Sequence, residues 1–186
     1  SITYEFFSYL ARHIENDLQK EGFSLFLCNS DEAFQKEEFY LRSLLDNQVS
    51  GIIMVSADIN QAARLVDAMD IPVILIDRFN PSAGIKKNVV CIQSDHYQGG
   101  KIAGEELIRS GAGRFAFLRT TKRTYPQQLR EEGFVTSMTK NKISKSKFRV
   151  YDSDPNPDIV SEKIMKIYRE FPFDGIFCGN DRIAYG

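Results

Sequence analysis

The hydrophobic positions of this 186-residue chain alternate between helical spacing and short runs that are apolar throughout. Between residues 6 and 20 the apolar side chains recur every three or four positions, which predicts an amphipathic helix that ends at Gly22. The next segment, Phe23–Cys28, is apolar almost throughout and predicts a strand. Further helices are predicted over residues 32–47, 59–69, 96–110, 127–140 and 159–170, with a last one beginning before residue 186, and further strands over residues 51–55, 73–76, 89–92, 115–118, 148–151 and 175–178.

Apolar strands that alternate with helices predict an α/β fold in which parallel sheets are covered by helices on both faces. Asp95 is expected to cap the helix that follows it, and Gly111 to end that helix. The glycines of the turn at residues 111–113 permit a change of chain direction, so we place the junction between two domains there. The segments at residues 50–58 (SGIIMVSAD) and 174–181 (DGIFCGND) share a glycine, an apolar strand and a following aspartate, as two similar halves would.

Composition and charge narrow the possible functions. The chain is 42% hydrophobic and 26% charged, which is ordinary for a soluble globular protein, and its formal net charge is -1. A domain that holds a nucleic-acid backbone by itself normally carries a strong basic excess, so any DNA contact must come from residues outside this chain. No apolar run approaches the roughly 20 residues of a membrane span, and the first residues lack the pattern of a secretory signal.

Cysteine and histidine usage argues against a metal centre. Cys28, Cys91 and Cys178 are widely spaced and lie in apolar runs, which favours buried free thiols in a reducing compartment. His13 and His96 are the only histidines of the sequence, so a histidine-rich metal site cannot be built. We therefore expect neither a metal nor a cofactor.

The candidate binding residues follow the predicted strands, because ligands of parallel α/β proteins bind beyond the carboxyl ends of the strands. Helix capping explains most of the short polar residues there, but it does not explain Arg130 or the carboxylate of Asp181. A guanidinium and a carboxylate directed at one crevice suit a polyol or a heterocycle, which both can fix through paired hydrogen bonds. Phe6 and Phe7 open the first helix, and either one of them stacks on a ligand or both lie in the core.

Enzyme motifs are missing from the sequence. There is no phosphate-binding GxGxxG between a strand and a helix, no GxSxG and no GxxxxGK[ST], and no nucleophile–base pair is visible. The acidic pairs 105–106 and 131–132 are interpreted as solvated helix faces. The basic run at residues 140–149 lacks interleaved aromatic residues and is interpreted as a solvated loop. We therefore do not expect an enzyme.

Five segments, in the same order along the chain, resemble motifs of LacI/GalR transcription regulators. The family's "ifcaND-x-x-A-x-G" segment is matched by GIFCGNDRIAYG, and its "iPvv-x-iDr" strand by IPVILIDR. The remaining three are the "D-x-x-x-gg-x-x-a-x-x-hL" helix, the "R-x-x-Gf" element and the "N-P-F-F"-like start. The matching segments are Gly175–Gly186, Ile71–Arg78, Asp95–Leu107, Arg130–Phe134 and Tyr4–Phe7.

This resemblance implies a type I periplasmic-binding-protein-like fold, with two Rossmann-like lobes and an effector in the cleft between them. It implies an N-terminal lobe at residues 1–112 that lacks its first strand, and a C-terminal lobe at residues 113–186 that is truncated, so the fold is incomplete at both ends. A glycine that the family carries after the strand predicted at residues 115–118 is replaced here by Arg119, Thr120 and Thr121. By position, the effector contacts implied are Phe6, Phe7, Asp77, Arg130, Asn180 and Asp181.

The function implied is that of a cytoplasmic repressor or activator whose effector closes the cleft and alters operator binding. A sugar or sugar phosphate is the first effector class and a nucleoside or purine the second. Operator DNA would be bound through a helix-turn-helix head outside this chain, and two-fold symmetric half-sites imply a homodimer. The alternative is an extracytoplasmic sugar-binding protein of an ABC importer, which shares the fold, and an enzyme on a doubly wound fold ranks last.

Overall fold

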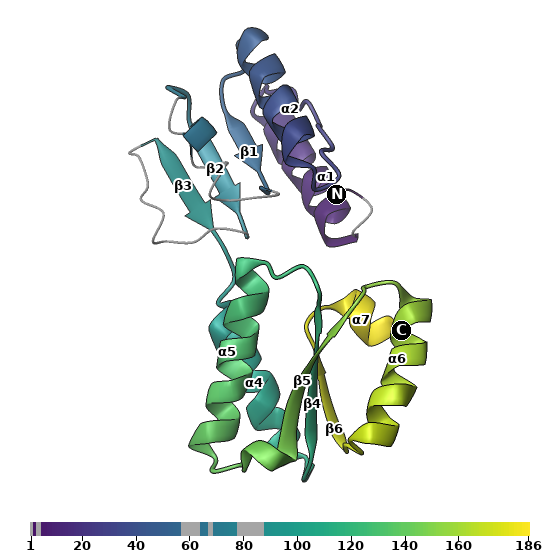
Figure 1. The fold of residues 1–186 in the computed structure, drawn as a ribbon. Helices are drawn as coiled ribbons and strands as arrows, with labels where there is room; N and C mark the ends of the chain where they lie inside the picture. Colours follow the sequence, from purple (N-terminus) through teal and green to yellow (C-terminus); the bar gives the residue numbers. More distant parts are fainter. Residues whose placement is uncertain (1, 3–4, 57–63, 67–68, 78–87) are drawn as a thin grey trace. The chain divides into compact units, whose positions relative to one another are not determined.

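The computed structural model describes residues 2, 5–56, 64–66, 69–77 and 88–186, which form two compact units, Ser1–Gln93 and Ser94–Gly186 (Figure 1). The first unit contains α1 (Glu5–Lys20), α2 (Phe34–Asp46), β1 (Ile52–Met54), β2 (Val73–Ile76) and β3 (Val89–Ile92). The second contains α4 (His96–Arg109), β4 (Phe115–Thr120), α5 (Tyr125–Lys140), a short 3-10 helix (Lys145–Lys147), β5 (Phe148–Ser153), α6 (Pro157–Glu170), β6 (Gly175–Cys178) and α7 (Asp181–Tyr185).

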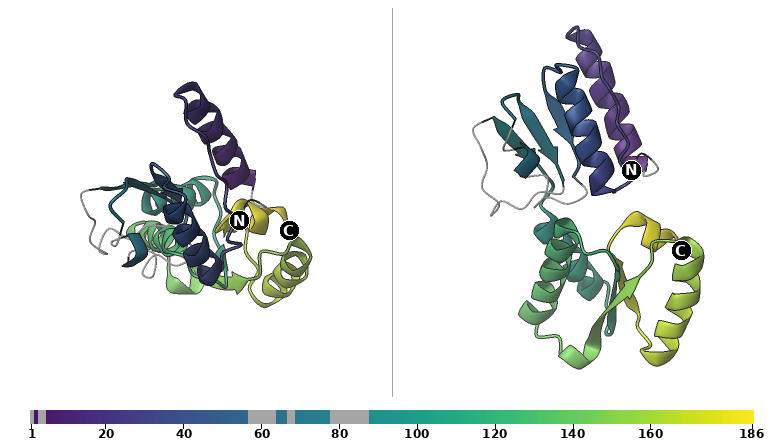
Figure 2. Two further views of the ribbon diagram at one scale, coloured as in Figure 1. Left: turned by 90° about the horizontal axis from the view of Figure 1, so that it is seen from above. Right: turned by 45° about the horizontal axis from the view of Figure 1, so that its top comes forward.

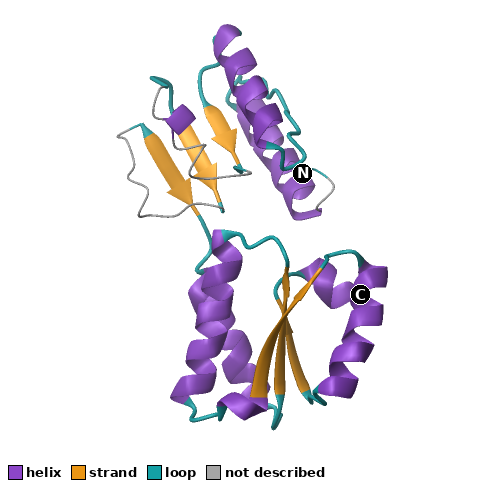
Figure 3. Cartoon of the chain, viewed as in Figure 1, coloured by secondary structure: helices purple, strands orange, loops and turns teal. Residues whose placement is uncertain are grey.

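Each unit is built around a parallel sheet, so the predicted α/β class is confirmed (Figure 3). Among the described residues the strand orders are β1-β2-β3 in the first unit and β5-β4-β6 in the second, and all the pairings are parallel. In the second unit, Leu118 is in register with both Tyr151 and Cys178. The residues that follow these three positions therefore emerge at one edge of the sheet.

Helices cover both faces of the sheet in the second unit, α4 and α5 on one face and α6 and α7 on the other (Figure 1). Phe117 of the central strand faces α5, and its ring lies 5.5 Å from that of Phe134 on α5. The ring of Phe177, on the neighbouring strand β6, lies 4.9 Å from it on the same face. The opposite face buries Leu118 against Val160 and Ile183. This burial on both faces explains why β4 and β6 begin as continuous apolar runs.

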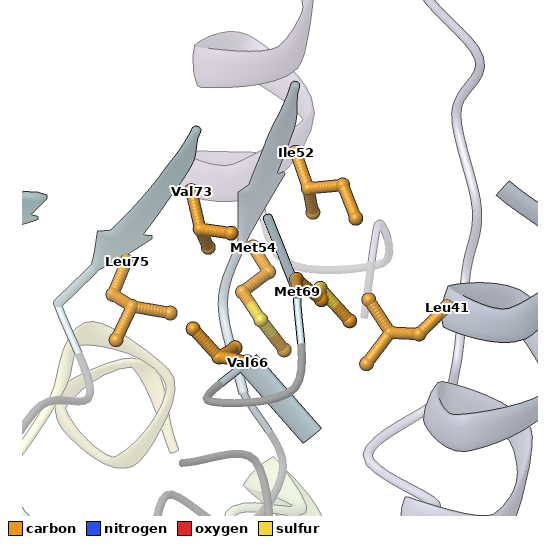
Figure 4. Close-up of a cluster of buried hydrophobic side chains, with 7 residues drawn as sticks. All are labelled: Leu41, Ile52, Met54, Val66, Met69, Val73 and Leu75. Carbon is orange, nitrogen blue, oxygen red and sulfur yellow. The ribbon is translucent and has the colours of Figure 1, made fainter. Parts of the chain in front are cut away.

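The first unit has its own hydrophobic core, in which side chains of the sheet meet α2 and the helical residues 64–66 (Figure 4). Met54 and Met69 take part in it, and their unbranched side chains fill gaps between branched neighbours. The buried members of this core are Leu41, Ile52, Met54, Val66, Met69, Val73 and Leu75.

The strand predicted over Phe23–Cys28 is wrong, because none of these residues joins a sheet. Phe26 and Leu27 are 67% and 60% exposed, and a cavity of about 190 Å³, lined by this segment, α1, α2 and β1, separates it from the sheet. A strand needs a neighbour that shares its backbone hydrogen bonds, and the apolar pattern alone cannot supply one. Helices α1 and α2 overlap in Figure 1 but stand apart when seen from above (Figure 2, left), with this cavity between them.

Most of the predicted helix boundaries agree with the structure. The first helix ends before Gly22, whose φ of 81° is of the left-handed kind that glycine tolerates. Asp95 caps α4 by accepting a hydrogen bond from the backbone N–H of Gln98 at 2.8 Å, and Gly111, with φ 89°, follows the end of that helix. Of the helix predicted over residues 59–69, residues 59–63 and 67–68 lie outside the described residues.

Along the chain, the boundary between the two compact units lies between residues 93 and 94, whereas the predicted domain junction lies between 112 and 113. The difference is helix α4 and the turn after it, which group with the second unit. Helix α4 packs against α5 so closely that a Cβ atom on Gly100 would lie 2.0 Å from the carbonyl oxygen of Arg130. The glycine turn that the sequence offered as a junction therefore lies inside the second unit.

The cysteines are free, as expected, but the prediction that all of them are buried is wrong. Cys28 is exposed, and Cys91 and Cys178 are half-buried. The exposure of Cys28 follows from the position of its segment outside the sheet. Burial raises the pKa of the Cys178 thiol above its ordinary value.

Candidate functional site

The carboxyl edge of the sheet in the second unit gathers the polar residues that follow its strands, at the upper end of this sheet in Figure 1. Arg119, the second-last residue of β4, lies opposite Asp152 of β5, and the turn that begins at Gly179 follows β6. Gly179 lies against β4, because its N–H donates to the carbonyl oxygen of Leu118 at 2.8 Å and a Cβ there would lie 3.3 Å from the Cα of Arg119. The absence of a side chain thus allows this turn to approach the central strand.

Arg130 projects from α5 onto this turn. Its Nη1 donates to the carbonyl oxygen of Gly179 at 2.6 Å, and its Nη2 lies 3.1 Å from Nδ1 of His96. The structure therefore brings the sequence-predicted Arg130 next to the segment that carries Asn180 and Asp181. Sequence reasoning missed His96, which is 5% exposed and begins α4.

Asn180 and Asp181 open the short helix α7. The side-chain oxygen of Asn180 accepts the N–H of Ile183 at 2.9 Å, so this residue acts as the helix cap. Asp181 is exposed, and one of its carboxylate oxygens accepts the N–H of Arg182 at 2.9 Å. Of the two, Asp181 has the carboxylate and the exposure that hydrogen bonding to a polar ligand requires.

Next to Arg130 lies a group of ion pairs centred on Arg119. Its Nε donates to Asp152 at 2.7 Å and its Nη1 donates to Glu131, which also accepts from Arg123 at 2.9 Å. The hydrogen bond with Asp152 is the main cause that raises the pKa of Arg119, and the same contact lowers the pKa of Asp152. The interpretation of Glu131 as a solvated residue is wrong, because its side chain is only 20% exposed and pairs with two arginines.

The first unit carries the other three predicted residues. Phe6 is 58% exposed, whereas Phe7 is half-buried and lines the cavity beside β1, and their rings meet edge to face at 5.1 Å. Asp77 follows β2 with a φ of 65°, and its N–H donates to the carbonyl oxygen of Ile92 at 2.8 Å. A left-handed backbone is uncommon for a residue other than glycine, and such residues concentrate at functional sites.

A buried polar pair in the first unit escaped the sequence analysis. Ser56 follows the end of β1, is 3% exposed, and donates from its hydroxyl to the carboxylate of Glu37 at 2.9 Å. Glu37 itself is 6% exposed and lies on α2. The position of Ser56 after a predicted strand could have singled it out from the sequence. Glu37 could not have been found in this way, because nothing in the helical pattern distinguishes it from its solvated neighbours.

The described part of the chain offers no metal site. No three of its His, Cys, Asp or Glu side chains come together in a way that would hold a metal ion. None of the described helices combines the length and the apolar character that crossing a bilayer demands.

Comparison with known proteins places these features in a family. Residues 2–186 match the family described as periplasmic binding proteins and sugar binding domain of the LacI family. The ribose operon repressor of Halalkalibacterium halodurans is 27% identical over 186 residues, which cover 100% of this chain and 53% of that protein. The chain therefore spans about half the length of this relative.

Solved structures give the same result. A LacI family transcriptional regulator of Enterococcus faecalis with bound ribose superposes with a TM-score of 0.80 at 28% identity, over 100% of this chain and 66% of that one. A periplasmic binding protein/LacI transcriptional regulator of Alkaliphilus metalliredigens, complexed with D-xylulofuranose, gives 0.77 at 30% identity, over 99% and 66% of the two chains. The chain thus belongs to the family of periplasmic binding proteins and LacI-type sugar-binding domains.

Proposed function

We propose that this chain is the effector-sensing part of a LacI-type transcription regulator, which binds a small sugar or sugar derivative and thereby controls operator binding. One observation carries the proposal: in a chain that matches this family over residues 2–186, Arg130 is anchored at the carboxyl edge of a parallel sheet. Ligands of α/β proteins bind at such edges, and a guanidinium presents several donors in one plane to ligand oxygens.

A sugar is the first ligand class because of the chemistry of the predicted residues. Hydroxyl groups both donate and accept, so a polyol can pair with the N–H groups of Arg130 and with the carboxylate of Asp181. The ribose and D-xylulofuranose bound by the two solved relatives support this class. Sugar phosphates belong to the same class, and nucleosides or purines are the second one.

We propose further that the units Ser1–Gln93 and Ser94–Gly186 are the two lobes of the sensor. Phe6, Phe7 and Asp77 would then supply ligand contacts from the first lobe, and Arg130, Asn180 and Asp181 from the second. The half-buried ring of Phe7 and the left-handed backbone of Asp77 support these assignments. Two lobes joined by a hinge provide the two states that a ligand can bias.

The partners proposed for the whole protein are operator DNA, bound through a head domain outside this chain, and a second copy in a homodimer. The repressor named above supports this role and a place in the cytoplasm over the alternative of an extracytoplasmic importer protein. A regulator of this kind performs no reaction, so we propose that the protein is not an enzyme.

The proposal is tested by thermal-shift measurements on the full-length protein with D-ribose, D-xylulose, sucrose, a sugar phosphate and a purine. A ligand that binds the native state raises the melting temperature, by an amount that grows with its concentration. Arg130→Ala and Asp181→Ala are expected to remove this rise, whereas the exposed neighbour Glu132, changed to Ala, should retain it. A rise with none of the sugars contradicts the ligand class, and an unchanged rise in both site variants contradicts the site.

A further inference from the structure

The contact between Arg130 and His96 defines the protonation state of a buried imidazole. Nη2 of Arg130 lies 3.1 Å from Nδ1 of His96, whose residue is 5% exposed. A guanidinium can only donate, so Nδ1 must be the acceptor and cannot carry a proton. The hydrogen bond therefore requires a neutral imidazole with its proton on Nε2.

The backbones of α4 and α5 fix the distance between these two side chains. A Cβ on Gly100 would lie 2.0 Å from the carbonyl oxygen of Arg130, and one on Gly133 would lie 2.0 Å from that of Tyr97. Only glycine permits this approach, which sets the start of α4 beside the second turn of α5. Asp95 in turn holds the first turn of α4 in place through the N–H of Gln98.

The guanidinium of Arg130 is consequently held at two of its three nitrogen atoms. Nη1 donates to Gly179, which follows Arg130 in the sequence, and Nη2 donates to His96, which precedes it. Two acceptors fix the plane of the group, while an arginine has five N–H donors in total. The donors that remain are directed by this plane and need no further ordering when a ligand arrives, which strengthens binding.

We propose that His96 is a positioning residue, whose neutral imidazole holds the guanidinium of Arg130 in the orientation that receives the effector. The role of Arg130 in binding rests on the proposed function, whereas the restraint by His96 stands on the structure of the second unit alone. The opposing interpretation is that His96 merely begins and packs α4. The two interpretations differ in what happens to the Arg130 side chain when only the acceptor is lost.

The first experiment observes the two side chains directly by nitrogen-15 NMR of the full-length protein. The wild-type spectrum is expected to contain a His96 ring with Nδ1 unprotonated and Nε2 protonated, and separate Nη–H signals for Arg130 because rotation about Cζ is hindered. His96→Asn retains an acceptor on the same Cγ atom and should retain these arginine signals. His96→Ala should average them, and Gln98→Ala, on the same turn of α4, serves as the matched control. A wild-type His96 protonated at Nδ1, or Arg130 signals unchanged in His96→Ala, overturns the proposal.

The second experiment measures D-ribose binding to the same variants by calorimetry. His96→Ala should weaken binding about tenfold, which corresponds to one charge-assisted hydrogen bond, whereas His96→Asn should stay within about threefold of the wild type. Equal losses in both variants overturn the positioning role, because a helix-packing role would not be rescued by asparagine. If D-ribose does not bind the wild-type protein, the proposed ligand fails, and the NMR spectra still decide the role of His96.

Discussion

Arg130 donates from Nη1 to the carbonyl oxygen of Gly179 across 2.6 Å, between two residues that are 49 positions apart in the chain. The same glycine donates its N–H to Leu118 of the central strand. The turn that carries Asn180 and Asp181 is therefore held from two sides, by α5 and by β4. Arg130 thus has a structural partner within the unit as well as a proposed ligand.

Replacing Arg130 by Lys should lower the free energy of unfolding by about 1 kcal/mol, because a single ammonium cannot reach Gly179 and His96 in one plane. Urea denaturation measures this difference. The control is Arg109→Lys, since the Arg109 side chain is 77% exposed and pairs with Glu106 one turn earlier on α4. Such a surface pair should change stability by less than about 0.5 kcal/mol. Equal effects in the two variants would contradict the anchoring of the turn by Arg130.

Replacing Gly133 by Ala should destabilise the second unit by about 2–4 kcal/mol, because the new methyl group would meet the carbonyl oxygen of Tyr97 at 2.0 Å. The two helix backbones must separate to admit it. Gly99→Ala is the matched control, since a Cβ there has no neighbour within 4 Å among the described residues. That variant should be more stable by about 0.5–1 kcal/mol through helix propensity. Chemical denaturation of both variants checks the prediction, and a loss of stability in Gly99→Ala as large as that in Gly133→Ala would refute it.

The three cysteines should react with an alkylating reagent in an order set by their burial. Desolvation raises the pKa of both the Cys28 and the Cys178 thiols, so exposure to the reagent sets their order. Cys28 is exposed and should be labelled first, whereas Cys178 is half-buried. Because the thiolate is the reactive form, the rate at each cysteine should rise with pH. Mass spectrometry after short pulses of reagent follows each site, and the rates should converge in urea. Native labelling of Cys178 as fast as that of Cys28 would contradict the fold of β6.

The second unit was predictable from the sequence to a large extent, because its strands β4 and β6 are covered on both faces. Continuous apolar runs such as residues 115–118 and 175–178 can hardly be placed anywhere but in a covered parallel sheet. The cap at Asp95 and the helix end before Gly111 are local, since they depend only on neighbouring backbone groups. Parallel strands then bring Arg119, Asp152 and Gly179 to one edge.

Features that depend on distant partners were not predictable. The segment Phe23–Cys28 has the composition of a strand, but the structure gives it no strand neighbour among the described residues. His96 and Glu131 look like ordinary helix residues until α4, α5 and β4 pack together and supply Arg130 and Arg119 as partners. The boundary between the two compact units differs from the predicted junction at residues 112 and 113 for the same reason. Helix α4 groups with the second unit because it packs against α5 at glycines, and a pattern of hydrophobic residues does not indicate such a contact.

The ion pair between Arg119 and Asp152 should contribute stability that is lost in acid. Their contact at 2.7 Å lowers the pKa of Asp152, so the folded protein holds this carboxylate ionised to a lower pH than the unfolded chain does. The contribution is therefore fully present above the ordinary aspartate pKa of about 3.9, and it disappears as the pH falls through the lower folded value. Since the Asp152 side chain is 49% exposed, solvent screening limits it to about 0.5–1 kcal/mol.

Asp152→Asn tests this linkage. The variant should unfold more easily than the wild type at pH 7, and the difference should narrow below about pH 4 as the wild-type carboxyl group takes up its proton. Molar salt should also narrow the difference in stability between the variant and the wild type at pH 7, because the ion pair is partly exposed to solvent. Denaturation midpoints across pH 2.5–7 measure the effect. In an Arg119→Gln background the pH-dependent effect of the substitution should become much smaller, because the main cation that lowers the pKa of Asp152 is gone and only the weaker influence of Arg123 and Lys163 remains. A difference that stays constant across this range, or that is undiminished after the loss of Arg119, would mean that Asp152 acts through something other than this ion pair.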